Sequence, residues 1–269
     1  FDPKKPDWPN RDRFVLSAGH GSMLLYSLLY LTGYEDISLE NIKNFRQLNS
    51  PTAGHPEYGE LKGIETTTGP LGQGLANSVG MAISESHLSK KFGKEVIEHY
   101  TFCLVGDGCL MEGISHESAS LAGHLKLGKL IVLFDDNKIT IDGPTNLSTS
   151  DDTTSRFESY GWQVLECDGH NFEDIDNKIS LAKSTNDKPT LIKCKTIIGK
   201  GSPNRSGTSG IHGAPLGEEE IKKTRENLNW SHDKFVIPNE ILSDWKLVSE
   251  RSTSEVDDWY KRLEKNKSF

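Results

Sequence analysis

Long apolar runs are missing from this sequence. Crossing a bilayer takes about 20 consecutive apolar residues, and no apolar run within the 269 residues approaches that length. No signal peptide is evident. We therefore expect no membrane partner and a cytoplasmic location, with an organelle as the alternative because the sequence does not begin with Met.

Cysteine is also scarce, and its spacing argues against a disulfide framework. No two of the four cysteines form a Cys-x-x-Cys pair. Cys103, Cys167 and Cys194 fall in apolar runs that read as strands, where buried free thiols are typical. Cys109 lies outside these runs, and we expect a small filler there rather than a catalytic thiol.

Positive charge is in deficit. The formal net charge is −8 and the calculated pI is about 5.6. An acidic chain of this kind argues against a nucleic-acid partner. Phosphorylated substrates remain compatible with it, because local basic groups can override the net charge.

Short apolar runs alternate with segments of helical pattern along the chain. The expected strands cover residues 14–16, 100–105, 130–134, 162–167 and 190–196. The expected helices cover residues 20–31, 35–48, 75–92, 172–182, 217–229 and 239–265. This alternation predicts an α/β fold, with a doubly wound, mostly parallel sheet and helices on both faces.

Polar residues follow two of the expected strands where each ends. Asp107 comes just after the run 100–105, and Asn137 follows the run 130–134. Open α/β sheets place their ligands at the carboxyl ends of the strands. Magnesium prefers about six oxygens in a near-ideal octahedron. Asp107, the Asn137 amide and the Ile139 carbonyl could supply three of them, and a diphosphate and water the rest.

Taken alone, these short motifs have simpler explanations. Asp-Gly is usually a turn, and Asp-Asn-Lys is usually a solvated loop. The second strand-ending polar residue, in the right place, favours a metal and diphosphate site. The helix between the two strands is expected to begin near Glu112, with its amino end facing the same end of the sheet.

Five segments together resemble one enzyme family. Residues 106–113 (GDGCLMEG) and 134–143 (FDDNKITIDG) resemble the cofactor motif of transketolases, which use thiamine diphosphate. Residues 11–34, 54–82 and 199–217 resemble further active-site segments of that family, in the same order. Related thiamine enzymes share the GDG…N pattern, but are not expected to share HGSMLLY, ETTTGPLGQG and HGAPLG as well. The resemblance implies the thiamine diphosphate-binding fold.

The resemblance assigns roles residue by residue. Asp107, Asn137 and the Ile139 carbonyl match magnesium ligands, with Ca²⁺ or Mn²⁺ as alternative ions. The implied cofactor-binding residues are Gly69, Leu71, Gly108, Glu112, Asn137, Ile141 and Ile198. Among these, Gly108 matches a diphosphate contact and Glu112 a glutamate that links the two active sites of a dimer.

Three histidines complete the implied site. His20 and His212 match histidines beside the cofactor, and His55 matches one that faces the substrate hydroxyls. Each lies in a Gly-rich loop, where binding groups concentrate, and a neutral imidazole can pass protons near pH 7. The other histidines are expected to be ordinary surface or core residues.

The implied reaction is the transfer of a two-carbon ketol unit from a ketose phosphate to an aldose phosphate. Thiamine diphosphate is the electron sink. We expect one diphosphate-binding domain over residues 1–269, with a truncated start and a terminal helical segment over 239–269. A homo-oligomer is also expected, because small residues on the helix 75–92 suit a subunit interface, although an ordinary core helix would carry them too.

The sequence departs from a complete enzyme of the family in three respects. No pyrimidine-binding domain or subunit, which would supply an activating acid, is evident. A further active-site histidine is absent, and Ser209-Gly210-Ile211 stands where many relatives carry a histidine and an aspartate. The isolated chain is therefore expected to be inactive. A related dihydroxyacetone- or deoxyxylulose-forming enzyme and a non-catalytic cofactor-binding partner subunit remain as alternatives.

Overall fold

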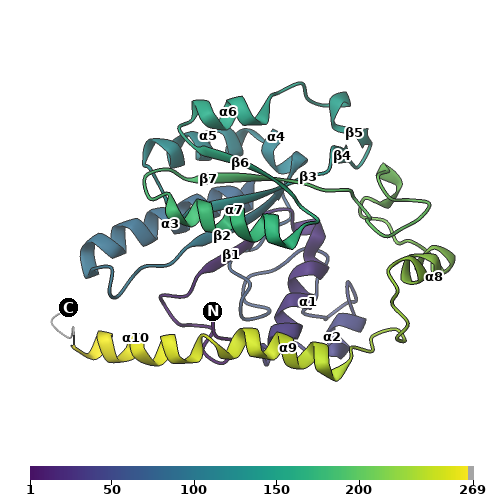
Figure 1. Ribbon diagram of the computed structural model, residues 1–269, viewed down its shortest axis with the longest axis horizontal. Helices are drawn as coiled ribbons and strands as arrows, with labels where there is room; N and C mark the ends of the chain where they lie inside the picture. Colours follow the sequence, from purple (N-terminus) through teal and green to yellow (C-terminus); the bar gives the residue numbers. More distant parts are fainter. Residues whose placement is uncertain (266–269) are drawn as a thin grey trace.

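A parallel five-stranded sheet lies at the centre of the computed structural model, which describes residues 1–265 (Figure 1). The strand order is β1-β2-β3-β7-β6, and every neighbouring pair is parallel. The strands are β1 (Arg13–Leu16), β2 (Thr101–Gly106), β3 (Leu130–Asp136), β6 (Gln163–Asp168) and β7 (Thr190–Lys195). A two-residue hairpin, β4 (Ile139–Thr140) with β5 (Gly143–Pro144), stands apart from it. All five expected strands are thus confirmed, with boundaries shifted by one or two residues.

Helices cover both faces of this sheet, as predicted (Figure 1). On one face lie α3 (Gln73–Phe92), α5 (Gly113–His124) and α6 (Thr153–Ser159). On the other lie α1 (Ser22–Thr32) and α7 (Phe172–Ser184). The shorter helices are α2 (Leu39–Lys43), α4 (Asp107–Met111) and α8 (Glu218–Asn227). None of the helices described over residues 1–265 is both long and apolar enough to cross a membrane.

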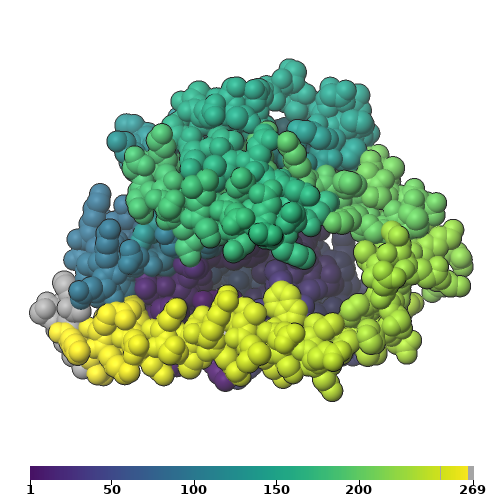
Figure 2. Space-filling model, viewed as in Figure 1, coloured from purple at the N-terminus to yellow at the C-terminus, as the bar shows by residue number. Residues whose placement is uncertain are grey.

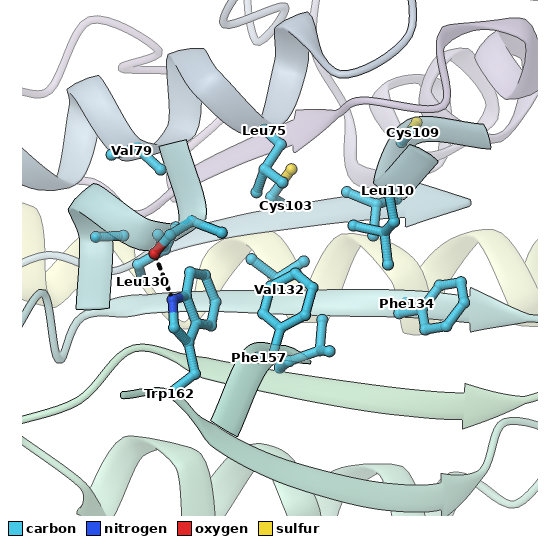
Figure 3. Close-up of a cluster of buried hydrophobic side chains, with 14 of the residues drawn as sticks. Leu75, Val79, Cys103, Cys109, Leu110, Leu130, Val132, Phe134, Phe157 and Trp162 are labelled. Atoms are coloured by element: carbon cyan, nitrogen blue, oxygen red, sulfur yellow. Dashed lines mark hydrogen bonds between the residues drawn. The ribbon is translucent and has the colours of Figure 1, made fainter. Parts of the chain in front are cut away.

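The larger core lies between the strands and the α3–α5–α6 face (Figure 3). Leu75 and Val79 of α3 pack there with Val132 of β3, and all three side chains are at most 2% exposed. Trp162 closes this core near α6 and donates its indole N–H to the Ala119 carbonyl of α5 at 2.8 Å (Figure 3). The buried donor is therefore satisfied, and the core is well specified.

Two helices form a long band along one side of the molecule, α9 (Asn239–Glu250) and α10 (Thr253–Lys265) (Figure 2). Trp259 of α10 is 2% exposed and packs edge-on against Trp8 near the amino terminus. The Trp259 indole donates to the Val96 carbonyl at 2.6 Å. The expected terminal helical segment 239–269 is thus helical as two pieces as far as residue 265, and residues 266–269 lie outside the described part.

One helix prediction needs correction. The segment 35–48 is not one helix: only Leu39–Lys43 is helical, capped by Ser38, and Arg46 then adopts a left-handed φ of 61°. The helix expected to begin near Glu112 is confirmed as α5, which starts at Gly113, but a further short helix precedes it. Asp107 opens the five-residue helix α4, and Glu112 is an extended residue that caps α5. Helix α6 was not expected at all.

Candidate cofactor and metal site

One cavity of about 470 Å³ opens at the carboxyl ends of β1, β2 and β3. It collects residues from segments that are far apart in the sequence. The predicted site residues that line it are His20, Leu71, Asp107, Gly108, Glu112, Asn137, Ile139, Ile141 and His212.

The parallel register explains why the two expected metal ligands share this cavity. Gly106, the last residue of β2, pairs with Asp135 of β3. Asp107 is therefore the first residue beyond one strand, and Asn137 the first beyond its neighbour. The expectation that both project from the same end of the sheet is confirmed.

Asp107 carries a carboxylate oxygen that the protein leaves unused. Its Oδ2 atom is buried and has no hydrogen-bond partner among the described residues. Burial first, and then the negative charge of Asp136, raise the pKa of Asp107 to about 7. A buried carboxylate without donors is costly. A bound cation would remove that cost.

The Asn137 amide is held in a fixed orientation. Its Nδ2 atom donates to Asp135 at 3.0 Å, and its Oδ1 atom accepts from the Ile139 backbone N–H at 2.9 Å. Asp135 in turn accepts from the Thr196 hydroxyl. An amide oxygen can take a second partner, so Oδ1 remains able to bind a cation while its neighbours orient it.

The short hairpin β4–β5 presents the Ile139 carbonyl. Ile139 pairs with Pro144 in this antiparallel ladder. The Thr145 N–H donates to the Lys138 carbonyl, so Ile139 and Pro144 form a non-hydrogen-bonded pair, in which the Ile139 carbonyl points away from β5. Thr140 stabilises the turn instead by donating its hydroxyl to the Gly143 carbonyl at 2.9 Å.

These groups fit a hard cation that shares its shell with an anionic ligand. One carboxylate, one amide and one carbonyl are oxygen donors of the type magnesium prefers. Within residues 1–265 no group of three or more His, Cys, Asp or Glu side chains is placed to hold a metal. The site therefore lacks a protein cage, and a diphosphate would have to supply the missing oxygens.

The three expected histidines are near one another. The rings of His20 and His212 stack, with centroids 4.9 Å apart and planes 26° apart. Burial, followed by the neighbouring His212 and His55, lowers the pKa of His20. The lowered pKa favours the neutral form of His20, in which one ring nitrogen can accept a proton.

The turn Gly69-Pro70-Leu71-Gly72 packs tightly against this histidine group. Gly69 has a φ of +145°, and a Cβ there would come within 3.2 Å of the His55 ring. A Cβ on Gly108 would lie 2.8 Å from Leu71 Cδ1. A side chain at position 108 would therefore displace the end of the Leu71 side chain.

Not every expected residue lines the cavity. His55 and Gly69 pack beside it, and Ile198 is a half-buried loop residue whose carbonyl accepts from Gly207 at 2.9 Å. Asp135, which orients the Asn137 amide, was not among the predicted site residues, although it stands in the same Asp-Asp-Asn run as Asn137. All four cysteines are buried free thiols, as expected, including Cys109.

Comparison with known proteins places the whole chain in one family. The family model described as "Transketolase, thiamine diphosphate binding domain" matches residues 1–268. A transketolase of Nostoc is 56% identical over 97% of this chain and 40% of its own length. Transketolase 1 of Escherichia coli is 58% identical over 91% of this chain and 37% of its own length.

Solved structures agree with these sequence matches. A crystal structure of a mutant Pichia stipitis transketolase with fructose-6-phosphate superimposes with a TM-score of 0.96 and 42% identity. It covers 99% of this chain and 40% of that protein. A Campylobacter jejuni transketolase gives a TM-score of 0.95 and 46% identity. The chain spans about 40% of the length of such relatives, and it belongs to the transketolase thiamine diphosphate-binding domain family.

Proposed function

We propose that this chain supplies the magnesium and diphosphate half of a transketolase active site. The reaction is the transfer of a two-carbon ketol unit from a ketose phosphate to an aldose phosphate, a step of pentose phosphate metabolism. The observation that carries the proposal is the unpartnered, buried Asp107 oxygen in the cavity that also holds Asn137 and Ile139. The relatives quoted above bear the name transketolase, which favours ketol transfer over dihydroxyacetone or deoxyxylulose formation.

In this proposal Asp107, Asn137 and the Ile139 carbonyl bind Mg²⁺, and Gly108 contacts the diphosphate. Leu71, Ile141 and the less closely placed Ile198 offer apolar surface to the rings of the cofactor, with Gly69 beside them. Thiamine diphosphate, when bound, supplies the carbon nucleophile and the electron sink that the reaction needs. The protein residues bind, orient and exclude water.

The histidines handle protons. The lowered pKa of His20 favours its neutral form, and its ring stacks on His212, so their ring nitrogens can accept or return a proton at a substrate hydroxyl. His55 lies beside Gly69, on the approach to this pair. Its proposed role is to bind substrate hydroxyls rather than to contact the metal.

The proposal also needs a partner. A pyrimidine-binding domain or subunit must cover the cavity from outside, since Ile141 is 69% exposed there. A homo-oligomer is proposed as well. Ile114 and Leu121 of α5, with Leu125 just after it, form an exposed apolar stripe that suits a subunit contact, and Glu112 lies at the start of the same helix. Four unpaired cysteines fit a reducing compartment, for which we propose the cytoplasm.

The test is reconstitution. The chain is mixed with a transketolase fragment that contains the remaining part of such an enzyme, and transfer from xylulose 5-phosphate to ribose 5-phosphate is followed. We expect turnover only on mixing, and weak cofactor binding by the chain alone. Use of a different acceptor would favour the related enzymes. Cofactor binding without turnover would favour a non-catalytic subunit.

A further inference from the structure

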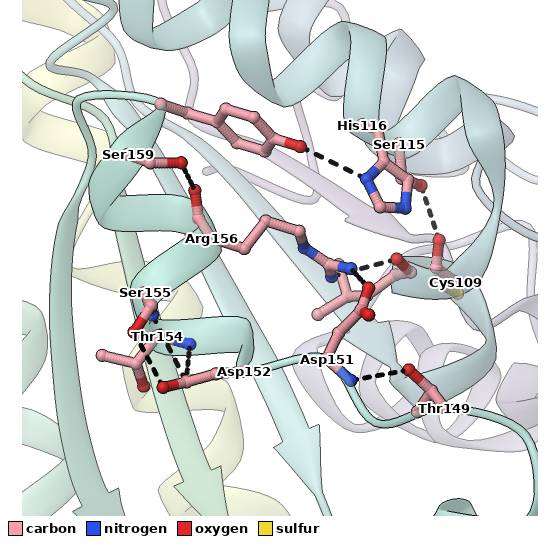
Figure 4. A network of polar contacts seen from close by, with 12 residues as sticks. Cys109, Ser115, His116, Thr149, Asp151, Asp152, Thr154, Ser155, Arg156 and Ser159 are labelled. Atoms are coloured by element: carbon pink, nitrogen blue, oxygen red, sulfur yellow. Dashed lines mark hydrogen bonds and ion pairs between the residues drawn. The ribbon is translucent and has the colours of Figure 1, made fainter.

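The helix that carries Asp107 is too short to hold itself in place. Helix α4 has five residues, so most of its carbonyl groups have no partner within the helix. Two are satisfied from elsewhere. Ser115 donates its hydroxyl to the Cys109 carbonyl at 2.5 Å, and Arg156 of α6 donates through Nη2 to the Leu110 carbonyl at 3.1 Å (Figure 4).

The second arm of Arg156 reaches a different segment. Its Nη1 atom donates to Asp151 Oδ2 at 2.9 Å (Figure 4). The guanidinium is well covered, with 15% of the side chain exposed, against 55% for Asp151. The two ends of one planar group therefore join α4 to the segment before α6.

That segment leads back to the other half of the metal site. The Asp151 N–H donates to the Thr149 hydroxyl at 3.2 Å, and the Thr149 N–H donates to the Thr145 carbonyl at 3.0 Å. The Thr145 N–H donates to the Lys138 carbonyl at 3.0 Å. Lys138 lies between Asn137 and Ile139. A continuous series of hydrogen bonds thus runs from the helix of Asp107 to the hairpin of Ile139.

The two halves also face each other across a small gap. Asp107, Leu110, Thr149, Asp151 and Arg156 line a cavity of about 20 Å³ behind the proposed metal site. Among the described residues Arg156 makes no ion pair with Asp107, and its guanidinium donates instead to the Leu110 carbonyl and to Asp151. It acts on Asp107 through the backbone of α4 rather than through its charge.

We propose that Arg156 is a positioning residue that sets the separation between Asp107 and the other two proposed metal ligands, Asn137 and the Ile139 carbonyl. This inference rests on the proposed function for its ligand. Magnesium demands near-ideal octahedral geometry at about 2.0–2.1 Å, whereas calcium accepts irregular shells at about 2.3–2.6 Å. A fixed separation therefore favours the smaller ion. Loss of Arg156 weakens Mg²⁺ binding more than Ca²⁺ binding.

The main experiment titrates Mg²⁺ or Ca²⁺ into the protein at saturating thiamine diphosphate, by calorimetry. In Arg156→Gln we expect the half-saturating Mg²⁺ concentration to rise about tenfold, a typical effect of removing a group that orients metal ligands. The Ca²⁺ value should rise less than about threefold. Equal changes for the two ions, or no change, would overturn the proposal, because general loosening does not discriminate between ions.

Three further variants distinguish the effect of the two guanidinium donors of Arg156 from the effect of its charge. Arg156→Lys keeps the charge but not the two fixed donors. The preference for Mg²⁺ over Ca²⁺, taken as the ratio of the two binding affinities, should fall as far as in Arg156→Gln. Asp151→Asn should lower the ratio less, and the double variant should match Arg156→Gln alone. Arg225→Gln on α8, outside the site, is the matched control and should change neither ion. Additive effects of the Arg156 and Asp151 changes would contradict a single link.

Hydrogen exchange of the unliganded protein tests the link between α4 and the β4–β5 hairpin without any cofactor. Arg156→Gln should speed exchange in residues 107–113 and 145–151 while β2 and β3 stay protected. Unchanged exchange in 107–113 overturns the proposal. If wild type binds thiamine diphosphate with neither ion but 107–113 loosens in the variant, the proposed function fails and the positioning role stands.

Discussion

Two acidic residues lie at opposite ends of the central sheet, Glu85 buried and Asp107 half-buried, and only one of them is paired by the protein. Glu85 of α3 is 5% exposed and meets Lys129, which precedes β3, at 3.1 Å. Asp107, at the carboxyl ends of the strands, has a buried oxygen with no hydrogen-bond partner among the described residues. Unpaired buried charge is expensive. The amino end of the sheet is completed by the protein itself, while the carboxyl end is built to be completed by a ligand.

The largest expected effect follows from removing the unpaired acid. Asp107→Ala deletes the only charged protein ligand of the proposed cation, so Mg²⁺-dependent binding of thiamine diphosphate should weaken at least about hundredfold. Calorimetry measures it. Glu85→Gln, at the other end of the sheet, is the control and should bind as wild type does. Unchanged affinity in Asp107→Ala would remove the site assignment.

The next effect comes from removing the cation that pairs with Glu85, so that both ends of the sheet hold an acid without a partner. Lys129→Met leaves Glu85 buried without its cation, and the free energy of unfolding should fall by about 3 kcal/mol at pH 7.5. Urea unfolding measures this change. Burial raises the pKa of Glu85 above its ordinary value, so the loss should shrink at pH 5. Adding Glu85→Gln should recover more than half of it; no recovery would mean that Lys129 stabilises the fold by packing alone.

The amino end also has buried polar groups without a partner among the described residues, and one of them, on His99, can titrate. His99 is 5% exposed, and its Nδ1 atom has no partner in the described part of the chain. Burial first, then the charge of Arg13, lower its pKa to about 4. The unfolded chain takes up this proton near pH 6.5, earlier than the folded protein.

Stability should therefore fall as the pH drops from about 6.5 to 4. The contribution of His99 is about 2–3 kcal/mol. His99→Gln should remove that part of the fall, measured by urea unfolding at several pH values. Parallel curves for wild type and variant would show that His99 keeps its ordinary titration.

The smallest effect concerns the cost of Asp107 itself in the unliganded protein. Burial, then Asp136, raise its pKa to about 7, so ionisation costs stability increasingly as the pH rises from about 4 through 7. Asp107→Asn should stabilise the protein by about 1 kcal/mol at pH 8, after allowance for solvent screening, and should change nothing at pH 4. A destabilised variant at pH 8 would show that the carboxylate is already satisfied.

Much of the sheet could be predicted, because its signals are local. The runs that became β2 and β3 are short, apolar and β-branched, and each ends in polar residues. Parallel strands bring such ends together, so Asp107 and Asn137 could be paired from the sequence. His20 and His212, whose rings stack, could be grouped only through the family resemblance, since no local pattern joins residues so far apart.

The parts that could not be predicted depend on contacts between distant segments. Helix α4 exists because Ser115 and Arg156 satisfy its carbonyls, and no local pattern shows that. The segment 35–48 has a polar helical composition, but its backbone turns back: the Arg46 N–H donates to the Thr52 carbonyl at 2.9 Å. Tertiary hydrogen bonds outweighed helix propensity there.

The position of β7 has a consequence for synthesis on the ribosome. Its residues are made last among the strands, yet it lies between β3 and β6. A nascent chain that has not reached Thr190 leaves one side of Leu130–Asp136 unpaired, with its apolar side chains beside an open strand. Exposed strands of this kind invite aggregation. Chaperone demand should therefore fall once Thr190–Lys195 has been made and that central gap is filled.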